Sequence, residues 1–222
     1  MAARGVRKNC PEGSEEKMRW GYILCIHPSV YDPSDDTYLI LEFFDENPEI
    51  LKGARVLEIG SGSGIISIHA IALGASRAVS IDISQLACEY TLYNAERALG
   101  DLDVAKIDVL RGDAALAMRK GSYFDLIIIN PPYLPQEETT GDPLLDSALY
   151  GGKSGVEVTA RILKSISERI RGNYTILLIH SSITGLNFTL EMMRSLSIRP
   201  FIVKERSFFF EKLYLIEGKK IG

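Results

Sequence analysis

Short apolar runs alternate with longer amphipathic segments along most of this chain. Uninterrupted runs rich in β-branched residues predict strands buried on both faces, and apolar residues spaced three or four apart predict helices. The predicted strands cover residues 55–59, 77–81, 104–110, 123–129, 174–179, 198–204 and 208–216. The predicted helices cover residues 65–73, 84–99, 156–171 and 185–196, and an earlier one begins near Ser34 or Asp35 and runs through Phe44.

The order of these elements predicts the fold class. Repeated strand–helix units indicate a parallel sheet with helices on both faces. The last two runs are joined by a short polar turn, so they form a hairpin and add one antiparallel strand. We therefore predict an α/β protein with a seven-stranded, mostly parallel sheet. Residues 1–20 are charged and irregular and are expected to form a flexible arm, and residues 21–222 a single domain.

Composition and charge narrow the class of protein. The chain is 46% hydrophobic and 24% charged, as is typical of globular proteins, and no apolar run approaches the roughly 20 residues that cross a bilayer. The first 20 residues lack the apolar core of a signal peptide, so we expect a cytoplasmic protein without membrane contact. A net charge of −4 gives no overall attraction to nucleic acid. Cys10, Cys25 and Cys88 form no C-x-x-C pair, which favours reduced thiols over disulfides or zinc.

A glycine-rich sequence follows the strand predicted at 55–59. It reads Glu58-Ile59-Gly60-Ser61-Gly62-Ser63-Gly64, and glycine allows a sharp turn and close approach of a ligand to the backbone. A dinucleotide site is disfavoured, because the third glycine of G-x-G-x-x-G would fall at Ile65, and no Walker A lysine follows. The remaining pattern, acid-x-G-x-G-x-G, is that of S-adenosylmethionine (SAM) binding in class I methyltransferases. A glycine-rich turn without a ligand is the alternative.

Acidic residues follow the next two predicted strands. Asp82 ends the strand at 77–81, where a carboxylate can accept both hydroxyls of a ribose, and Ile83 would then lie against the adenine ring. Asp113, followed by Ala114, comes after the strand at 104–110 and can accept a hydrogen bond from the adenine amino group. Taken alone, each aspartate is more often a surface or helix-capping residue. Glycines or an acid at three successive strand ends favour SAM.

The candidate catalytic residues are Asn130, Pro131, Pro132 and Tyr133, directly behind the apolar run 124–129. The carboxyl end of a buried parallel strand is where open α/β sheets bind ligands. Prolines lack N–H groups and restrict the backbone, so this segment presents a rigid array of carbonyl oxygens. With the Asn130 side-chain oxygen, that array can accept hydrogen bonds from a planar –NH2 group, and Tyr133 can cover its face.

With these motifs in this order, residues 30–217 resemble the Rossmann-like class I methyltransferases. Within that class they are similar to the NPPY-type protein-glutamine methyltransferases that modify translation release factors, and most of all to the short HemK-like branch of eukaryotes and archaea. Three segments carry the closer match: residues 30–37, 130–133 and the Gly-Gly-x-x-Gly loop within 148–155. In that branch the tyrosine and threonine matching Tyr31 and Thr37 line the methionine end of SAM. The residues expected to bind the cofactor are therefore Tyr31, Thr37, Glu58, Gly60, Ser61, Gly62, Asp82, Ile83, Asp113, Ala114 and Asn130.

The resemblance implies methylation of the glutamine amide in the Gly-Gly-Gln loop of a class I release factor. The alternatives are methylation of an exocyclic amino group of a DNA or RNA base, methylation of a protein lysine, and an inert scaffold that keeps the fold. The resemblance also implies a small zinc-binding activator that extends the sheet beside residues 104–110, with Ile107, Val109 and Leu110 as apolar contacts. An ordinary edge strand is the alternative there.

Two further predictions concern the loop at 134–155 and the histidines. The loop is long for this fold and carries four acids, so it is either a lid that grips the substrate or a solvated acidic insertion. His69 and His180 lie within apolar elements and are expected to be core or edge residues rather than catalysts. His27 lies near Cys25, but two possible ligands make no metal site, and we expect none.

Overall fold

The computed structural model describes residues 9–136 and 139–221. Its strands are β1 (Glu15–Arg19), β2 (Tyr22–Ile26), β3 (Arg55–Ile59), β4 (Arg77–Asp82), β5 (Ile107–Arg111), β6 (Leu126–Ile129), β7 (Tyr174–Ser181), β8 (Ile198–Ser207) and β9 (Lys212–Lys220). Its α-helices are α1 (Asp35–Glu46), α2 (Ile65–Ala72), α3 (Gln85–Ala98), α4 (Asp101–Val104), α5 (Pro143–Leu149), α6 (Glu157–Arg169) and α7 (Leu186–Ser195). Two 3-10 turns, η1 (Pro48–Ile50) and η2 (Ala114–Ala117), complete the described elements. None of the described helices is long and apolar enough to cross a membrane.

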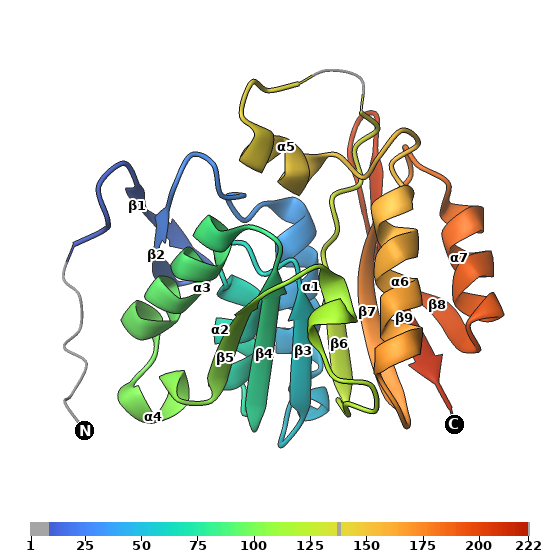
Figure 1. Cartoon of the computed structure of the whole chain (residues 1–222), viewed down its shortest axis with the longest axis horizontal. Helices are drawn as coiled ribbons and strands as arrows, with labels where there is room; N and C mark the ends of the chain where they lie inside the picture. Colours follow the sequence, from blue (N-terminus) through green and yellow to red (C-terminus); the bar gives the residue numbers. More distant parts are fainter. Residues whose placement is uncertain (1–8, 137–138, 222) are drawn as a thin grey trace.

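The central sheet has the strand order β5-β4-β3-β6-β7-β9-β8 (Figure 1). Neighbouring strands are parallel except for the two pairs that β9 makes, with β7 and with β8. The predicted seven-stranded sheet with one antiparallel strand is thus confirmed. From β3 the chain builds outward to β4 and β5, and then crosses back to place β6 on the other side of β3. The carboxyl ends of β3 and β6 therefore lie side by side at the switch point of the sheet, where ligands bind in such folds.

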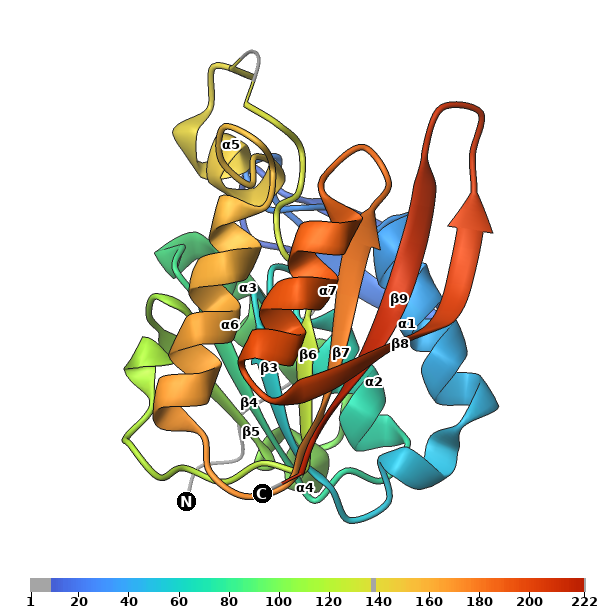
Figure 2. The same cartoon turned by 90° about the vertical axis from the view of Figure 1, so that its right-hand side faces the viewer.

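Helices cover both faces of the sheet (Figures 1 and 2). Helices α1 and α2 pack on one face, against strand residues such as Val56 and Ile128. Helices α6 and α7 pack on the other, against Leu57 and Ile127. Successive strand residues point to opposite faces, and because both faces are covered the central strands are apolar at nearly every position.

A small hairpin corrects two predictions about the N-terminal region. Strand β1 pairs antiparallel with β2, so residues 15–19 are not part of a flexible arm, while residues 1–8 lie outside the described residues. Cys10 and Cys25 form a disulfide, so these two thiols are not reduced, and Cys88 alone is free. Cys25 lies in β2 and Cys10 in the segment before β1, and a separation of 15 residues without a C-x-x-C pair carries no signal for such pairing.

Three predicted strands begin later than expected. Residues 101–104 form α4, with two aspartates in its first turn, so β5 begins at Ile107 and not at 104. Strand β6 begins at Leu126 and not at 123. The polar residues taken for the final turn extend β8 to Ser207, so β9 begins at Lys212 and not at 208. The turn lies at residues 208–211, where the Phe208 N–H donates to the Glu211 carbonyl at 2.7 Å.

Candidate active site

A cavity of about 450 Å³ opens at the carboxyl ends of β3, β4 and β6. All the residues that the sequence predicted for cofactor binding or catalysis line it, namely Tyr31, Thr37, Glu58, Gly60, Ser61, Gly62, Asp82, Ile83, Asp113, Ala114, Asn130, Pro131, Pro132 and Tyr133. They come together because parallel strands end at one edge of the sheet and the start of α1 closes that edge. The roles of the single residues remain predictions.

The turn between β3 and α2 is built from glycines in the left-handed region. Gly60, Gly62 and Gly64 have φ values of 82°, 52° and 83°. A Cβ at Gly64 would lie 2.9 Å from the Cα of Thr91 on α3. The third glycine therefore allows α2 to begin close against α3, which is a packing reason for its position.

Glu58 lies in the cavity wall and is only 1% exposed. Its Oε2 accepts hydrogen bonds from the hydroxyl and, at 3.1 Å, from the backbone N–H of Ser67. Its buried Oε1 has no hydrogen-bond partner among the described residues. Burial raises the pKa of this carboxyl to about 8. With a pKa of about 8 the carboxyl is mostly protonated at neutral pH, and because Oε2 accepts from Ser67 the proton lies on Oε1. Oε1 becomes an acceptor when a positively charged ligand group favours the carboxylate.

Asp82 fixes two turns at once. One carboxylate oxygen accepts the N–H of Gly62 at 3.0 Å, and the other accepts the N–H of Ser84 at 2.9 Å. Burial raises the pKa of this carboxyl, partly offset by these backbone hydrogen bonds. Ile83 beside it is 52% exposed and lines the cavity, so an apolar surface adjoins the carboxylate.

Asp113 forms an ion pair with Arg161 of α6, with 3.6 Å between Arg161 Nε and Asp113 Oδ1. Ala114, which follows, is buried and has a φ of 50°, a left-handed conformation that is uncommon for a residue with a side chain. Arg161 also lines the cavity and was not predicted. The helical pattern of 156–171 identifies only the buried face of α6, and Arg161 lies outside it.

The Asn130 side chain is held by a short chain of hydrogen bonds from α1. Asn130 Nδ2 donates to Thr37 Oγ1 at 3.2 Å, and Thr37 Oγ1 donates to Asp36 Oδ1 at 3.1 Å. Because the Thr37 proton is directed to a carboxylate, Thr37 offers Asn130 a lone pair, and Asn130 must face it with its –NH2 group. Asn130 Oδ1 is buried and has no hydrogen-bond partner within the described part of the chain.

Asp36 also joins the two tyrosines of the site. The hydroxyls of Tyr31 and Tyr133 donate to Asp36 Oδ2 at 2.9 and 3.4 Å, and Asp36 is 3% exposed. Burial, and next the charge of Asp36, raises the pKa of both tyrosine hydroxyls, which keeps them protonated as donors. Asp36 was not predicted as a site residue, because the sequence cannot distinguish it from the adjacent aspartate, Asp35. In the structure Asp35 instead pairs with Arg206 at the surface.

The Gly-Gly-x-x-Gly loop lies directly behind the tetrapeptide 130–133. A Cβ at Gly151 would lie 2.5 Å from the Pro132 carbonyl oxygen, and a Cβ at Gly155 would collide with the Tyr133 carbonyl oxygen. Gly155 also has a φ of 82°. These glycines allow two backbones to touch, and the contact holds the Pro132 and Tyr133 carbonyls in place.

The predicted loop at 134–155 contains helix α5, capped by the Asp142 side chain, which accepts the N–H of Leu144 at 2.9 Å. Leu144, Ala148 and Leu149 line the cavity, and Figure 1 shows α5 above the end of the sheet. The helix therefore lines the cavity on one side, although none of its residues is fully buried. Residues 137–138 lie outside the described residues, and gripping of a substrate by this segment stays a prediction.

His69 and His180 are buried core residues, as predicted. His69 Nε2 lies 2.9 Å from Asp45 Oδ1, and burial lowers the pKa of its ring. Burial lowers the pKa of His180 to about 4. Neither histidine is among the residues that line the cavity.

The cavity is electronegative. Four carboxyl side chains line it, and Arg161 is the one basic side chain among its described lining residues. The four are Asp36, Glu58, Asp82 and Asp113. Such a site attracts a ligand with positive charge and disfavours a pyrophosphate.

The fold and the site are those of a class I methyltransferase. A family model described as ribosomal protein L11 methyltransferase (PrmA) matches residues 35–130, from the start of α1 to Asn130. Among solved structures, the Mtq2–Trm112 complex of E. cuniculi, described as responsible for methylation of the termination factor eRF1, is similar with a TM-score of 0.64 and 25% identity. That similarity covers 86% of this chain and 99% of the other.

Within this class, sequence relatives show the family. A putative protein N5-glutamine methyltransferase of Methanocaldococcus jannaschii is 32% identical over 202 residues, which cover 90% of this chain and 97% of the relative. Methyltransferase HEMK2 of Homo sapiens is 31% identical over 145 residues, 63% of this chain and 65% of the relative. The chain belongs to the protein N5-glutamine methyltransferase family.

Proposed function

We propose that this enzyme transfers a methyl group from SAM to the side-chain amide nitrogen of the glutamine in the Gly-Gly-Gln loop of a translation release factor. The observation that carries the proposal is the orientation of Asn130, whose amide is fixed through Nδ2 while Oδ1 remains a buried acceptor without a partner among the described residues. The Mtq2 complex, described as methylating eRF1, supports this acceptor. A release factor works at the ribosome, so we place the reaction in the cytoplasm.

The lining residues fit SAM. Asp82 would accept the ribose hydroxyls, Ile83 would contact the adenine ring, and Asp113 would accept from the adenine amino group. The unpartnered Oε1 of Glu58, once deprotonated, would accept from the ammonium group of SAM, whose positive charge favours the carboxylate. SAM supplies a methyl group on a positively charged sulfonium, and the excess of carboxyl groups in the cavity matches that charge.

Positioning is the main catalytic contribution of the chain's own residues. The nitrogen lone pair of an amide is delocalised into its carbonyl group, so the acceptor must be aimed well at the methyl group. Asn130 Oδ1 and the Pro131 carbonyl would accept the two amide N–H groups, and Tyr133 would cover the face of the amide. The same acceptors would favour the positive charge that develops on nitrogen as its bond to the methyl carbon forms and the sulfonium–methyl bond breaks; the nitrogen then loses one proton to solvent. Asp36 and Thr37 act through Asn130 as positioning residues.

We also propose that a small zinc-binding activator pairs with β5. The complex of Mtq2 with Trm112 supports a partner subunit, and β5 is the edge strand of the sheet here. Leu110 is 38% exposed and available for such contact, whereas Ile107, which the sequence suggested as a contact, is only 7% exposed and belongs to the core. We regard residues 21–222, which include β2 of the N-terminal hairpin, as one catalytic domain.

The test is incubation of the enzyme with isotope-labelled SAM and a release factor, followed by mass mapping of the modified residue. We expect one methyl group on the glutamine of the Gly-Gly-Gln loop, and no transfer by Asn130→Ala. Label on a lysine, or on added RNA or DNA, would replace this proposal with one of the alternatives. Absence of label in every acceptor, with SAM bound and the proposed activator present, would indicate an inert scaffold.

A further inference from the structure

The turn between β8 and β9 presents three consecutive phenylalanines to solvent. Phe208, Phe209 and Phe210 are 41%, 91% and 86% exposed. The rings of Phe209 and Phe210 pack edge to face with 4.5 Å between centroids, so they form one apolar surface. Figure 2 shows this turn, here called the aromatic tip (residues 208–210), extending beyond the end of β7. A rigid turn needs no aromatic residues, so exposed rings at three adjacent positions indicate contact with another molecule.

The stem of the hairpin is fastened to α1. Arg206 pairs with Asp35 at 3.0 Å and also with Glu42, and Lys204 pairs with Glu46. At the other side of the turn, Ser181 Oγ donates to Glu211 Oε1 at 2.5 Å. The aromatic tip is therefore held in a defined place before any partner arrives, which lowers the ordering cost of binding.

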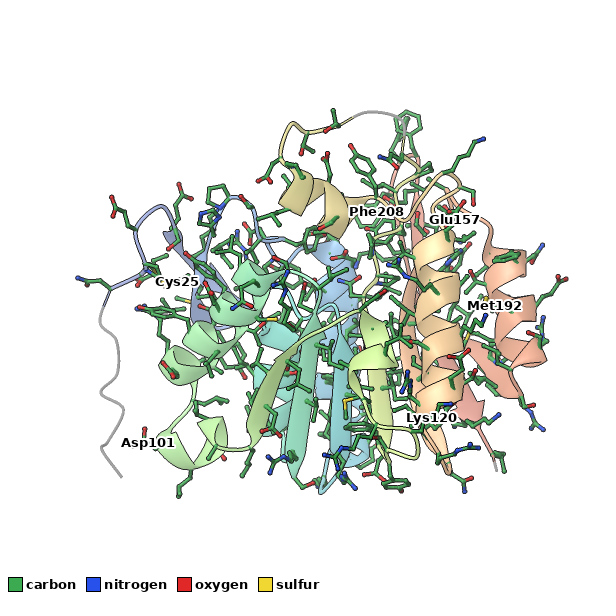
Figure 3. The ribbon with its side chains drawn as sticks, viewed as in Figure 1. Cys25, Asp101, Lys120, Glu157, Met192 and Phe208 are labelled. Carbon is green, nitrogen blue, oxygen red and sulfur yellow. A yellow bond between two sulfur atoms is a disulfide. The ribbon has the colours of Figure 1, made fainter. Side chains whose placement is uncertain are left out.

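The aromatic tip adjoins the active site. A second, more open hollow of about 450 Å³ is lined by the three phenylalanines together with Tyr133, Asp36 and Leu213. Tyr133 and Asp36 also line the cofactor cavity, so the two hollows meet at the catalytic tetrapeptide. Figure 3, in which Phe208 is labelled, shows that it lies at the end of the sheet that α5 covers. A protein that inserts a glutamine beside Tyr133 would pass the aromatic tip.

We propose that the aromatic tip is the docking surface for the acceptor protein and receives an apolar patch beside the methylated loop. This inference rests on the proposed function. The charges around the tip favour a protein over a nucleic acid, since single strands that stack on aromatic rings also need a positively charged groove. The three cations of the adjoining stem, Lys204, Arg206 and Lys212, are each paired with a carboxylate. A second copy of this chain seated there would cover Tyr133 and compete with the acceptor.

The experiment compares two acceptors for the double variant Phe209→Ser, Phe210→Ser: the full-length release factor and a short peptide carrying its Gly-Gly-Gln loop. Both rings lie outside the core, so the fold is expected to persist. Leu102→Ser on α4, where the leucine is 86% exposed, is the matched control. We expect the KM for the full-length factor to rise about tenfold in the double variant, with kcat, the peptide rate and SAM affinity unchanged, and no change in the control.

Two kinetic results would overturn the inference while the proposed function stands. One is a kcat/KM of the double variant on the full-length factor that equals the wild-type value. The other is an equal loss on factor and peptide, which would mean that the tip shapes the active site and docks nothing. A wild-type enzyme that self-associates through these rings, shown by a dimer that the double variant cannot form, would assign the tip to a second copy. If the wild type methylates neither acceptor, the proposed function itself fails, and the inference fails with it.

Discussion

Thr37→Val tests the hydrogen-bond chain that orients Asn130. The substitution keeps the shape of a residue that is 3% exposed, but it removes the oxygen that accepts from Asn130 Nδ2 at 3.2 Å. Without that acceptor the Asn130 amide is free to turn, and its –NH2 group then faces the substrate amide, which it cannot hold. A neutral hydrogen bond contributes about 1 kcal/mol net, and a buried donor left unsatisfied costs up to about 3 kcal/mol.

These energies set the expected size of the effect. At saturating SAM and acceptor we expect kcat to fall at least roughly fivefold and at most roughly 150-fold. Thr37→Ser keeps the hydroxyl and should restore most of the rate. Thr189→Val is the matched control, because Thr189 is also buried but its hydroxyl has no partner among the described residues.

The assay is steady-state methyl transfer at saturating SAM and acceptor, with SAM affinity measured separately by calorimetry. Binding must be separated from transfer because Thr37 lines the cofactor cavity. Two results would refute the role of the Thr37 hydroxyl in orienting Asn130. One is a kcat of Thr37→Val equal to that of the wild type, and the other is a Thr37→Ser variant as slow as Thr37→Val.

Three further predictions follow from the site. Asn130→Ala should abolish transfer with SAM affinity nearly intact, whereas Asp82→Ala should chiefly weaken SAM in calorimetry; the reverse pattern would contradict the assigned roles. Gly155→Ala should lower kcat more than SAM affinity, because a Cβ there displaces the Tyr133 carbonyl; unchanged kinetics would show that the contact is unimportant. The folded-state pKa of Glu58, about 8, lies above its ordinary value of 4.5, so the folded state holds the proton more tightly and loses stability as pH rises between these values. Glu58→Gln should remove that part of the pH dependence in denaturant unfolding, and an unchanged slope would contradict the burial argument.

Much of the fold, and the set of residues that line the site, could be predicted because both depend on the order of strands and helices along the chain. Buried parallel strands are continuous apolar runs, and the residues that follow them meet at one edge of the sheet. Gly60, Asp82, Asp113 and Asn130 each follow such a run, so their convergence required no knowledge of side-chain packing.

The remaining features depend on contacts between distant segments. Asp35 and Asp36 are chemically identical neighbours, and only the direction of α1 decides which one enters the site. The Cys10–Cys25 disulfide depends on a hairpin that the charged sequence before residue 20 did not indicate. The three phenylalanines of the aromatic tip have high strand propensity and were assigned to the last strand, but the register of β8 on β9 places them in the turn.

The central claim is that Asn130 Oδ1 and the Pro131 carbonyl grip the two hydrogens of a glutamine amide. A crystal structure of the enzyme with S-adenosylhomocysteine and a Gly-Gly-Gln peptide tests it most directly. The account predicts that both oxygens lie at hydrogen-bond distance, roughly 2.7–3.2 Å, from the glutamine nitrogen, with Asn130 Nδ2 still on Thr37. A glutamine nitrogen bound elsewhere, or an Asn130 amide that turns its –NH2 group toward the peptide, would contradict it.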